Sequence, residues 1–406
     1  MSTRHIPYWL DRVSKARRPS YPRLRGRLET SVAIVGGGLT GCACAWSFAA
    51  AGVKVVLLEA EAIGAGATAR GLGLIREDFD ASFQATASAH GLRAARSLWQ
   101  AMRRASLDFP AALRRLGIKC DLAPEDLIVF ERDPQASRLL QREYQSRRDA
   151  GFDHSWLKPA VLSREAAIES GGGIRTHGFS LDPYRACLGL ASAAASRGAL
   201  LFEKSQVRRI HVGRKQVEIA TAAGSVRAEA VLVATTAPLP DLRALRRHLK
   251  ALDGYAVVTE SLPAAVRRQV GRRTGALRDT DAPPHMLRWL KEDRILFAGA
   301  DQAQLPERAR DKALVQRTGQ LMYELSVLYP GVSGLQPEWA WDFTHYETVD
   351  RLPFVGLHRN FPRHLFAMGA SRHGAGFAWL SARNLLRHYQ GDSAKGDDLF
   401  GFSRVL

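Results

Sequence analysis

The pattern of apolar and polar residues predicts a strand–helix–strand unit near the start of the chain. Apolar residues fill positions 32–35 and, apart from Lys54, positions 53–58, and a glycine-rich turn followed by small and apolar residues lies between them. Short continuous apolar runs are typical of strands that are buried on both faces of a parallel sheet. The intervening segment has the composition of a helix, and Gly52 is well placed to end it.

Three glycines in the turn match the spacing G-x-G-x-x-G, at Gly36, Gly38 and Gly41. Between a strand and a helix, these glycines permit a tight turn, close approach of a pyrophosphate and close helix–strand packing. The helix N-terminus adds N–H groups and the positive end of a dipole. Glu59 ends the second strand, where a carboxylate would bind ribose hydroxyls and favour FAD or NAD over NADP. A dinucleotide site is therefore predicted, with an ordinary glycine turn as the alternative.

A second segment of small residues follows at positions 62–75, and Arg70 is its only charged residue before position 76. Such a segment indicates a backbone that another molecule approaches closely. We expect a second cofactor loop in which Arg70 is suited to the pyrophosphate. The alternative is a mobile glycine loop with an unpaired arginine.

The rest of the chain alternates between helical and strand patterns. Residues 80–116 are expected to form one or two long helices, and Asp182 and Pro183 begin another as N-cap and first residue. Short strands are expected over 200–233, followed by an antiparallel pattern from Lys250. A small-residue loop at 369–376 precedes a final helix. Residues 1–30 form a leader without a strand signal, whose aromatic residues suggest that it packs on the surface.

The amino-acid composition is ordinary, and the net charge is its one unusual feature. The chain has 406 residues, of which 46% are hydrophobic and 24% charged, as in soluble globular proteins. No apolar run approaches the ~20 residues of a membrane span, and no apolar signal segment follows the basic N-terminus, so the cytoplasm is expected. The net charge of +18 is spread over many short pairs. This favours a solvated basic surface, and nucleic-acid binding is kept as an alternative.

The four cysteines have no metal-binding spacing, and no metal is expected. Cys42 and Cys44 lie in the first predicted helix, whereas Cys120 and Cys187 are isolated in the sequence. We expect all four to be small buried residues.

Four motifs together resemble the FAD-dependent oxidoreductases of the D-amino acid oxidase, glycine oxidase and sarcosine oxidase superfamily. They read VAIVGGGLTG…LLEA, GAGATARGLGLI, LDP…VLVATTA and DRLPFVG…MGASRHGAGF, and they extend over nearly the whole chain. The leader, PYWLD…YPRL, and the ATAR loop are most similar to the γ-glutamylputrescine oxidase-like branch. The resemblance implies an α/β fold with a Rossmann-like FAD-binding domain (1–84, 176–245 and 346–406). It further implies an α+β substrate domain (85–175 and 246–345) with a mixed or antiparallel sheet.

The resemblance also implies non-covalent FAD, since no cysteine stands where it would bond the flavin. The helix that begins near Phe377 would place its N-terminus at the flavin, where N–H groups stabilise the anionic reduced ring. The motifs imply these cofactor-binding residues: Gly36, Gly38, Leu39, Thr40, Gly41, Glu59, Ala60, Gly66, Ala67, Thr68, Arg70, Gly71, Leu72, Val207, Ala234, Thr235, Gly369, His373, Gly374, Gly376 and Phe377.

The implied reaction is oxidation of a C–N bond. A hydride passes from the carbon beside an amine nitrogen to flavin N5, water hydrolyses the imine, and O2 or another acceptor reoxidises the flavin. Amino-acid-oxidising members of the superfamily hold the substrate carboxylate with an arginine, and His345 stands at that position here. Because histidine cannot form the bidentate pair, an amine or a larger N-substituted compound is favoured as the substrate.

Further residues are candidates for the substrate site, each with a structural alternative. Arg288 could replace the missing clamp or form a structural salt bridge. Tyr255 and Trp289 could line an aromatic cage or pack in the core. His373 could contact the flavin or orient its loop, and His345 itself could be a packed strand residue.

Two other functions stay open at this point. One is an FAD enzyme that acts on a modified tRNA base, which the positive charge would suit. The other is a flavin-binding subunit without turnover.

Overall fold

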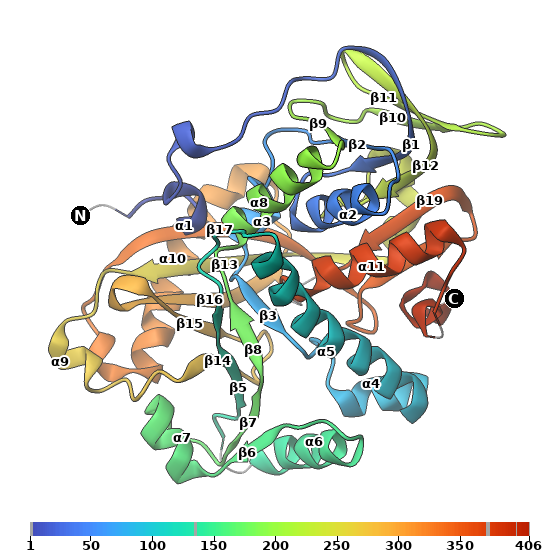
Figure 1. Cartoon of the computed structure of the whole chain (residues 1–406). Helices are drawn as coiled ribbons and strands as arrows, with labels where there is room; N and C mark the ends of the chain where they lie inside the picture. Colours follow the sequence, from blue (N-terminus) through green and yellow to red (C-terminus); the bar gives the residue numbers. More distant parts are fainter. Residues whose placement is uncertain (1–2, 134–135, 371–373, 395, 406) are drawn as a thin grey trace.

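Two large β-sheets organise the chain in the computed structural model, which describes residues 3–133, 136–370, 374–394 and 396–405 (Figure 1). The first sheet has the central order β10-β11-β12-β1-β2-β9, and β19 and β18 extend it from β12. Its strands are β1 (Gly26–Val35), β2 (Val55–Leu58), β9 (Leu200–Phe202), β10 (Arg209–Val212), β11 (Val217–Ala220), β12 (Gly224–Val233), β18 (Phe354–His358) and β19 (Phe361–Met368). The pairs β12–β1, β1–β2, β2–β9 and β12–β19 are parallel. The parallel pair β1–β2 agrees with the buried parallel strands that the first apolar runs predict.

Helices cover one face of this sheet. They are α2 (Leu39–Ala50), α8 (Pro183–Ser196) and α11 (Gly376–Gln390), and α2 contacts both of the others. The helix α8 begins as predicted, because the Asp182 carboxylate accepts a hydrogen bond from the Arg185 N–H at 2.9 Å. The long α5 (Leu92–Arg115) packs on α11, and α4 (Phe83–His90) precedes it.

The second sheet is mostly antiparallel, with the order β17-β13-β16-β15-β14-β5-β7-β6. Its strands are β5 (Asp126–Phe130), β6 (Ser155–Leu157), β7 (Gly173–Thr176), β13 (Leu249–Thr259), β14 (Gly275–Asp279), β15 (Met286–Leu290), β16 (Arg294–Ala303) and β17 (Pro337–Thr348). Successive residues alternate between its faces. One face packs in a core with α10 (Glu307–Leu328), whereas the other face joins the core of the first sheet's helices.

Shorter elements connect these parts. A small sheet joins β3 (Leu74–Arg76), β8 (Gly178–Ser180) and β4 (Ala123–Pro124). The remaining helices are α1 (Tyr8–Asp11), α3 (Ala67–Arg70), α6 (Ser137–Asp149), α7 (Pro159–Ala166) and α9 (Ala264–Arg267). Short 3-10 helices lie at Lys15–Arg17, Pro240–His248, Lys291–Asp293, Pro330–Val332, Asp397–Phe400 and Phe402–Val405.

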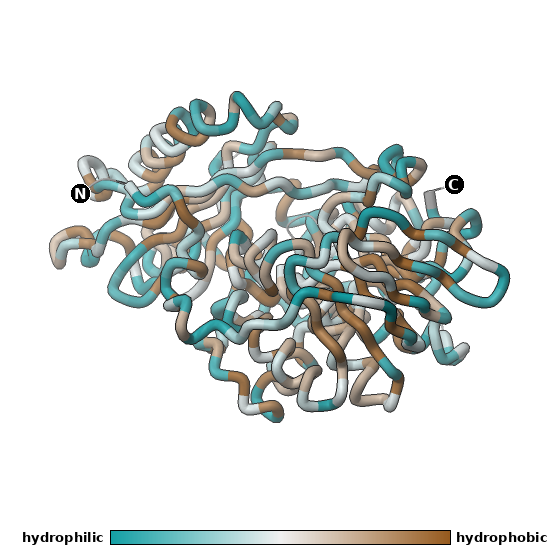
Figure 2. The backbone as a smooth tube through the Cα atoms, turned by 90° about the horizontal axis from the view of Figure 1, so that it is seen from above, coloured by the Kyte–Doolittle hydropathy of each residue, from teal (hydrophilic) through white to brown (hydrophobic). Residues whose placement is uncertain are grey.

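The α/β class with a mixed second sheet is confirmed, whereas the boundaries of the two domains stay a prediction. The expectation that residues 1–30 contain no strand is wrong, because β1 begins at Gly26 and pairs with β12 from Gly224 onward. Residues 26–31 are mostly polar and only partly buried, so they carry no apolar signal. Figure 2 shows many of the hydrophobic residues in the interior of the molecule and many of the hydrophilic residues in its outer loops. Within the described ranges, no helix has both the length and the apolar character to cross a membrane.

Candidate active site

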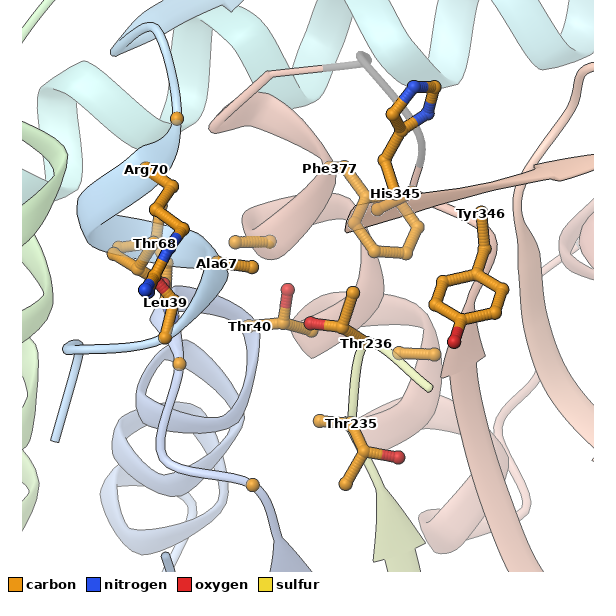
Figure 3. Close-up of a pocket in the computed structure, with 18 of the residues that line it drawn as sticks. Leu39, Thr40, Ala67, Thr68, Arg70, Thr235, Thr236, His345, Tyr346 and Phe377 are labelled. Carbon is orange, nitrogen blue, oxygen red and sulfur yellow. The ribbon is translucent and has the colours of Figure 1, made fainter. Parts of the chain in front are cut away.

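A cavity of about 680 Å³ lies where the first sheet, its helices and β17 meet. Its walls come from the turn before α2, the loop around α3, the end of β12, the end of β19 and the start of α11 (Figure 3). These predicted cofactor residues line it: Gly36, Gly38, Leu39, Thr40, Glu59, Ala60, Gly66, Ala67, Thr68, Arg70, Gly71, Leu72, Val207, Ala234, Thr235, Gly369, Gly374 and Phe377. The cavity volume is within the ~300–1,000 Å³ usual for ligand pockets.

The glycine turn is shaped by close backbone contacts. Gly36 has a φ of +107°, and a Cβ there would lie 2.8 Å from the Ala234 carbonyl oxygen. A Cβ on Gly41 would overlap the Gly36 carbonyl oxygen, so this glycine permits the close packing of α2 and does not itself line the cavity. A Cβ on Gly38 would lie 3.2 Å from Thr68 Oγ1. Any larger residue at Gly36 or Gly41 would therefore displace the turn.

Glu59 closes the cavity beyond β2 and is fixed by backbone donors. Its carboxylate accepts hydrogen bonds from the N–H of Gly37 at 2.7 Å and from the N–H of Glu61 at 2.9 Å. The side chain therefore joins the end of β2 to the glycine turn. This is the position from which a carboxylate binds the ribose of an adenine dinucleotide.

The loop around α3 forms the opposite wall. The Thr68 hydroxyl accepts a hydrogen bond from the Leu39 N–H at 2.8 Å and so joins this loop to the start of α2. Arg70 donates to the Ala65 carbonyl at 3.0 Å, and its side chain lines the cavity (Figure 3). A positive side chain and a helix N-terminus thus flank the same space.

The C-terminal part of the cavity is built on β3 and α11. The N–H of Ala375 donates to the Leu74 carbonyl at 2.8 Å, and Gly374, with a φ of +73°, has no room for a Cβ beside the same carbonyl. Gly376 does not line the cavity, since the Cβ of a larger residue would face Met102 Cε at 3.1 Å. His373 lies outside the described residues.

These features fit FAD. A turn without Cβ atoms, the N-terminus of a 12-residue helix, an arginine and a terminal carboxylate provide places for the pyrophosphate and the ribose. All four cysteines are buried and none lines the cavity. Cys187 is not isolated in space, because its Sγ lies 3.6 Å from Cys42 Sγ, behind the turn. The spacing in sequence gave no indication of this contact.

The wall on the side of the second sheet contains His345. Its side chain is 5% exposed, and Nε2 lies 2.7 Å from Asp301 Oδ2 on β16. A Cβ on Gly254 would lie 2.8 Å from the Asp301 carboxylate and 2.7 Å from the Phe343 ring, so this glycine makes room for both. Phe343 and Tyr346 of β17 also line the cavity. Figure 3 shows the side chains of His345 and Tyr346 pointing in opposite directions from the strand. The wall therefore combines a buried histidine–carboxylate pair with aromatic side chains.

Three predicted substrate residues lie elsewhere. Tyr255 packs on the α10 side of the second sheet, where its hydroxyl accepts a hydrogen bond from Gln302 at 2.6 Å and burial raises its pKa. Trp289 points to the same core, beside Tyr329. Arg288 is 6% exposed and donates to three backbone carbonyls, those of Leu72, Gly73 and Leu181. None of the three lines the cavity, so the structure favours their structural alternatives.

Several cavity residues were not predicted from the sequence. Met286, Ala298, Phe343, Thr344, Tyr346 and Thr236 line it, and Asp301 supports His345. Arg76 also lines it, but this arginine pairs with Asp78 at 2.9 Å and Asp80 at 3.1 Å. Thr344 and Tyr346 adjoin His345 and Thr236 adjoins Thr235, so these three were within reach of sequence reasoning. Met286, Ala298 and Asp301 depend on strand register, which no local pattern reveals.

Comparison with known proteins agrees with this site. The family model described as FAD dependent oxidoreductase matches residues 31–387. The chain is 26% identical to the gamma-glutamylputrescine oxidoreductase of Escherichia coli over 382 residues, which cover 93% of this chain and 87% of that protein.

Solved structures share the fold. Glycine oxidase from Geobacillus kaustophilus has a TM-score of 0.74 at 20% identity and covers 90% of this chain and 96% of its own. L-alpha-glycerophosphate oxidase from Mycoplasma pneumoniae, solved with FAD bound, has a TM-score of 0.69 at 14% identity, with 89% and 95% covered. Because the family model matches most of its length, the chain belongs to the FAD-dependent oxidoreductases of the D-amino acid oxidase family.

Proposed function

We propose that this enzyme oxidises the C–N bond of an amine or an N-substituted amino acid. In this reaction the carbon beside the nitrogen would give up its hydrogen as a hydride to bound FAD, which O2 or another acceptor would reoxidise. The nitrogen loses a proton, and water hydrolyses the resulting imine to a carbonyl compound and ammonia or a smaller amine. The names of the E. coli and G. kaustophilus relatives, an oxidoreductase of an amine derivative and an amino-acid oxidase, support this class of substrate.

One observation carries the proposal most directly. The wall of the cavity on the side of the second sheet contains His345, paired with Asp301, and aromatic residues of the same strand. From the sequence pattern, we assign His345 to the position of the carboxylate-binding arginine of amino-acid-oxidising members. Arg288, the predicted substitute, holds backbone carbonyls outside the cavity. Among the described residues of this wall, therefore, none offers the bidentate fork that a simple α-amino acid needs.

The chain's own residues have distinct tasks in this scheme. When bound, FAD supplies the acceptor for two electrons. Phe343, Tyr346 and Met286 exclude water from the substrate, which strengthens polar interactions inside the cavity. His345 receives or holds the amine proton, and Asp301 fixes the orientation of its ring.

Anaerobic bleaching of the flavin band near ~450 nm tests the proposal. The titrants are polyamines, N-methyl amines, N-substituted amino acids and simple D- and L-α-amino acids. We expect bleaching by amines or N-substituted compounds and none by simple α-amino acids. Rapid bleaching by a simple α-amino acid would contradict the substrate class, and a protein that binds no flavin would contradict the cofactor.

A further inference from the structure

Four successive carbonyls of the cofactor loop are each held by a side chain from outside the cavity. The indole N–H of Trp341 donates to the Arg70 carbonyl at 3.1 Å, and that of Trp9 donates to the Gly71 carbonyl at 2.8 Å. Arg288 Nη1 donates to the carbonyls of Leu72 at 2.8 Å and Gly73 at 3.2 Å. The three donors come from the leader, β15 and β17, which are far apart in sequence.

This arrangement decides what the loop presents to a cofactor. Residues 70–73 all line the cavity, whereas Trp9, Arg288 and Trp341 do not. The carbonyl oxygens of the loop are therefore engaged away from the cavity. Carbonyls turned inward would repel an anionic cofactor.

Trp9 and Arg288 act as one unit. The guanidinium of Arg288 lies over the Trp9 ring, 5.1 Å from its centroid, and is further held by the Leu181 carbonyl at 2.8 Å and by Glu125 at 3.5 Å. Gly73, with a φ of +70°, leaves room for this contact, because a Cβ there would lie 2.5 Å from Arg288 Nη1. The loop, the arginine and the tryptophan therefore fit together without space for a larger residue at Gly73.

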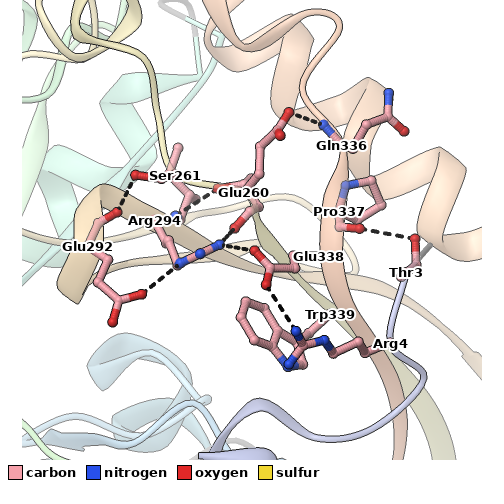
Figure 4. A network of polar contacts seen from close by, with 12 residues as sticks. Thr3, Arg4, Glu260, Ser261, Glu292, Arg294, Gln336, Pro337, Glu338 and Trp339 are labelled. Carbon is pink, nitrogen blue, oxygen red and sulfur yellow. Dashed lines mark hydrogen bonds and ion pairs between the residues drawn. The ribbon is translucent and has the colours of Figure 1, made fainter. Parts of the chain in front are cut away.

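The leader that carries Trp9 is fastened at both of its ends. Near the N-terminus, Thr3 Oγ1 donates to the Pro337 carbonyl at 3.0 Å. The backbone of Arg4 forms an isolated parallel β-bridge with that of Trp339, beside the ion pair of Arg294 and Glu338 (Figure 4). At the other end, the Leu24 N–H donates to Ser205 Oγ at 2.9 Å. The leader thus runs from the second sheet to the first and passes the cofactor loop at Trp9.

From these contacts we infer that Trp9 is a positioning residue of the cofactor site. Together with Trp341 and Arg288, it holds the backbone of residues 70–73 in the orientation that accepts FAD. Since no described residue of the leader (3–25) lines the cavity, its effect reaches the cofactor only through the loop.

Conservative tryptophan variants test this role. Trp9→Phe and Trp341→Phe each keep an aromatic ring but remove the donor to the loop. Trp99→Phe is the control: Trp99 is buried on α5, packs against Phe83 and Phe152, and lies outside the cavity lining. Apoprotein is titrated with FAD, and the dissociation constant is measured by fluorescence quenching.

We expect Trp9→Phe and Trp341→Phe each to raise the FAD dissociation constant about 3- to 10-fold, the equivalent of one hydrogen bond. Trp99→Phe should stay within about twofold of the wild type, whatever its melting temperature. Unchanged affinity in the first two variants, or an equal loss in the control, would overturn the inference.

Hydrogen–deuterium exchange on the wild type gives a test that needs no variant. Because coupling is reciprocal, FAD binding should slow exchange in residues 5–13, although these do not line the cavity. Exchange in α6, which does not line the cavity, should not change. Protection of the glycine turn at 36–41 without protection of residues 5–13 would contradict the inference. Absence of protection at the glycine turn would instead contradict the cofactor site itself.

Discussion

Glu59 shows how a single side chain can both hold a turn and line a cavity. Its carboxylate accepts two backbone hydrogen bonds, and the one from Gly37 ties it to the glycine turn, where we expect the pyrophosphate of FAD. The same side chain lines the cavity. Loss of the Glu59 carboxylate would therefore remove the expected hydrogen-bond acceptor for the ribose and would also loosen the glycine turn.

Replacing Glu59 by glutamine should weaken FAD binding. Hydrogen bonds to charged groups contribute about 1.5–3 kcal/mol, so the dissociation constant should rise about 10- to 100-fold. The exposed neighbour Glu61 provides the control, since Glu61→Gln leaves the cavity lining intact. Equal affinities in a calorimetric titration of the two variants would contradict the role given to Glu59.

Gly254 provides a second test at this scale, because it makes room for Asp301 behind His345. A methyl group in Gly254→Ala would press on Asp301 and Phe343, and the cost of such overpacking is about 1–3 kcal/mol of stability. Flavin reduction by substrate should slow about tenfold or more, whereas FAD affinity should hold. Gly319→Ala on α10, where the added methyl meets open space, is the control. Reduction as fast as in the wild type would count against the proposed role of the His345–Asp301 pair.

At the scale of elements, local patterns predicted most of what the structure contains. Three features could be predicted because they depend only on residues close together in the sequence. They are the apolar runs of β1 and β2, the glycine turn and the Asp182 N-cap. The face on which a strand residue lies depends on tertiary packing. Arg288 and Trp289 are adjacent in β15 and point to opposite faces, and neither lines the cavity. Asp301 meets His345 only through the register of β16, β13 and β17, for which the sequence contains no local signal.

A buried histidine joins the second sheet to α10. His285 lies 2.8 Å from Asp279 and 3.0 Å from Glu324, and its ring stacks on Phe297. Asp279, Asp281 and His285 form a group in which the potential metal-ligand atoms all lie within 4.8 Å of one another. The ion pairs of His285 with Asp279 and Glu324 explain why the histidine lies there. Burial alone would lower the pKa of His285, but the hydrogen bond and charge of Asp279, aided by Glu324, raise it above the usual 6.5.

This shift predicts a pH dependence of stability. Because the folded-state pKa is raised, the stabilisation is fully present below pH 6.5 and is lost as the pH rises through the folded-state value. Urea unfolding between pH 6 and pH 9 should show a steeper loss of stability for the wild type than for His285→Gln. Parallel curves for the two proteins would mean that His285 makes no such contribution.

At the scale of the whole molecule, the cavity joins the two sheets. Its lining includes Gly36 and Glu59 beside the first sheet and Met286 and His345 in the second. The basic surface has a less specific origin, since several of its arginines are paired, among them Arg267 and Arg273 with Asp293. For the net charge of +18, a solvated basic surface stays the prediction, with a nucleic-acid partner as the alternative.

Binding of FAD should therefore stabilise both sheets together. At 100 times its dissociation constant, FAD adds about 2.7 kcal/mol to the free energy of unfolding, which for this chain length raises the melting temperature by about 3 °C. Differential scanning calorimetry should show one transition that moves as a whole, and FMN, which lacks the adenosine part, should move it less. Two transitions of which only one responds to FAD would contradict a shared cavity.

The reductive half-reaction tests the central claim most directly. With FAD bound and oxygen excluded, stopped-flow absorbance follows flavin reduction by an amine that bleaches the wild type, and His345→Gln is compared under the same conditions. The account predicts that the limiting rate falls about 10²-fold or more in the variant, while FAD affinity is unchanged. Equal limiting rates in the two proteins would show that the wall containing His345 is not where the C–N bond is oxidised.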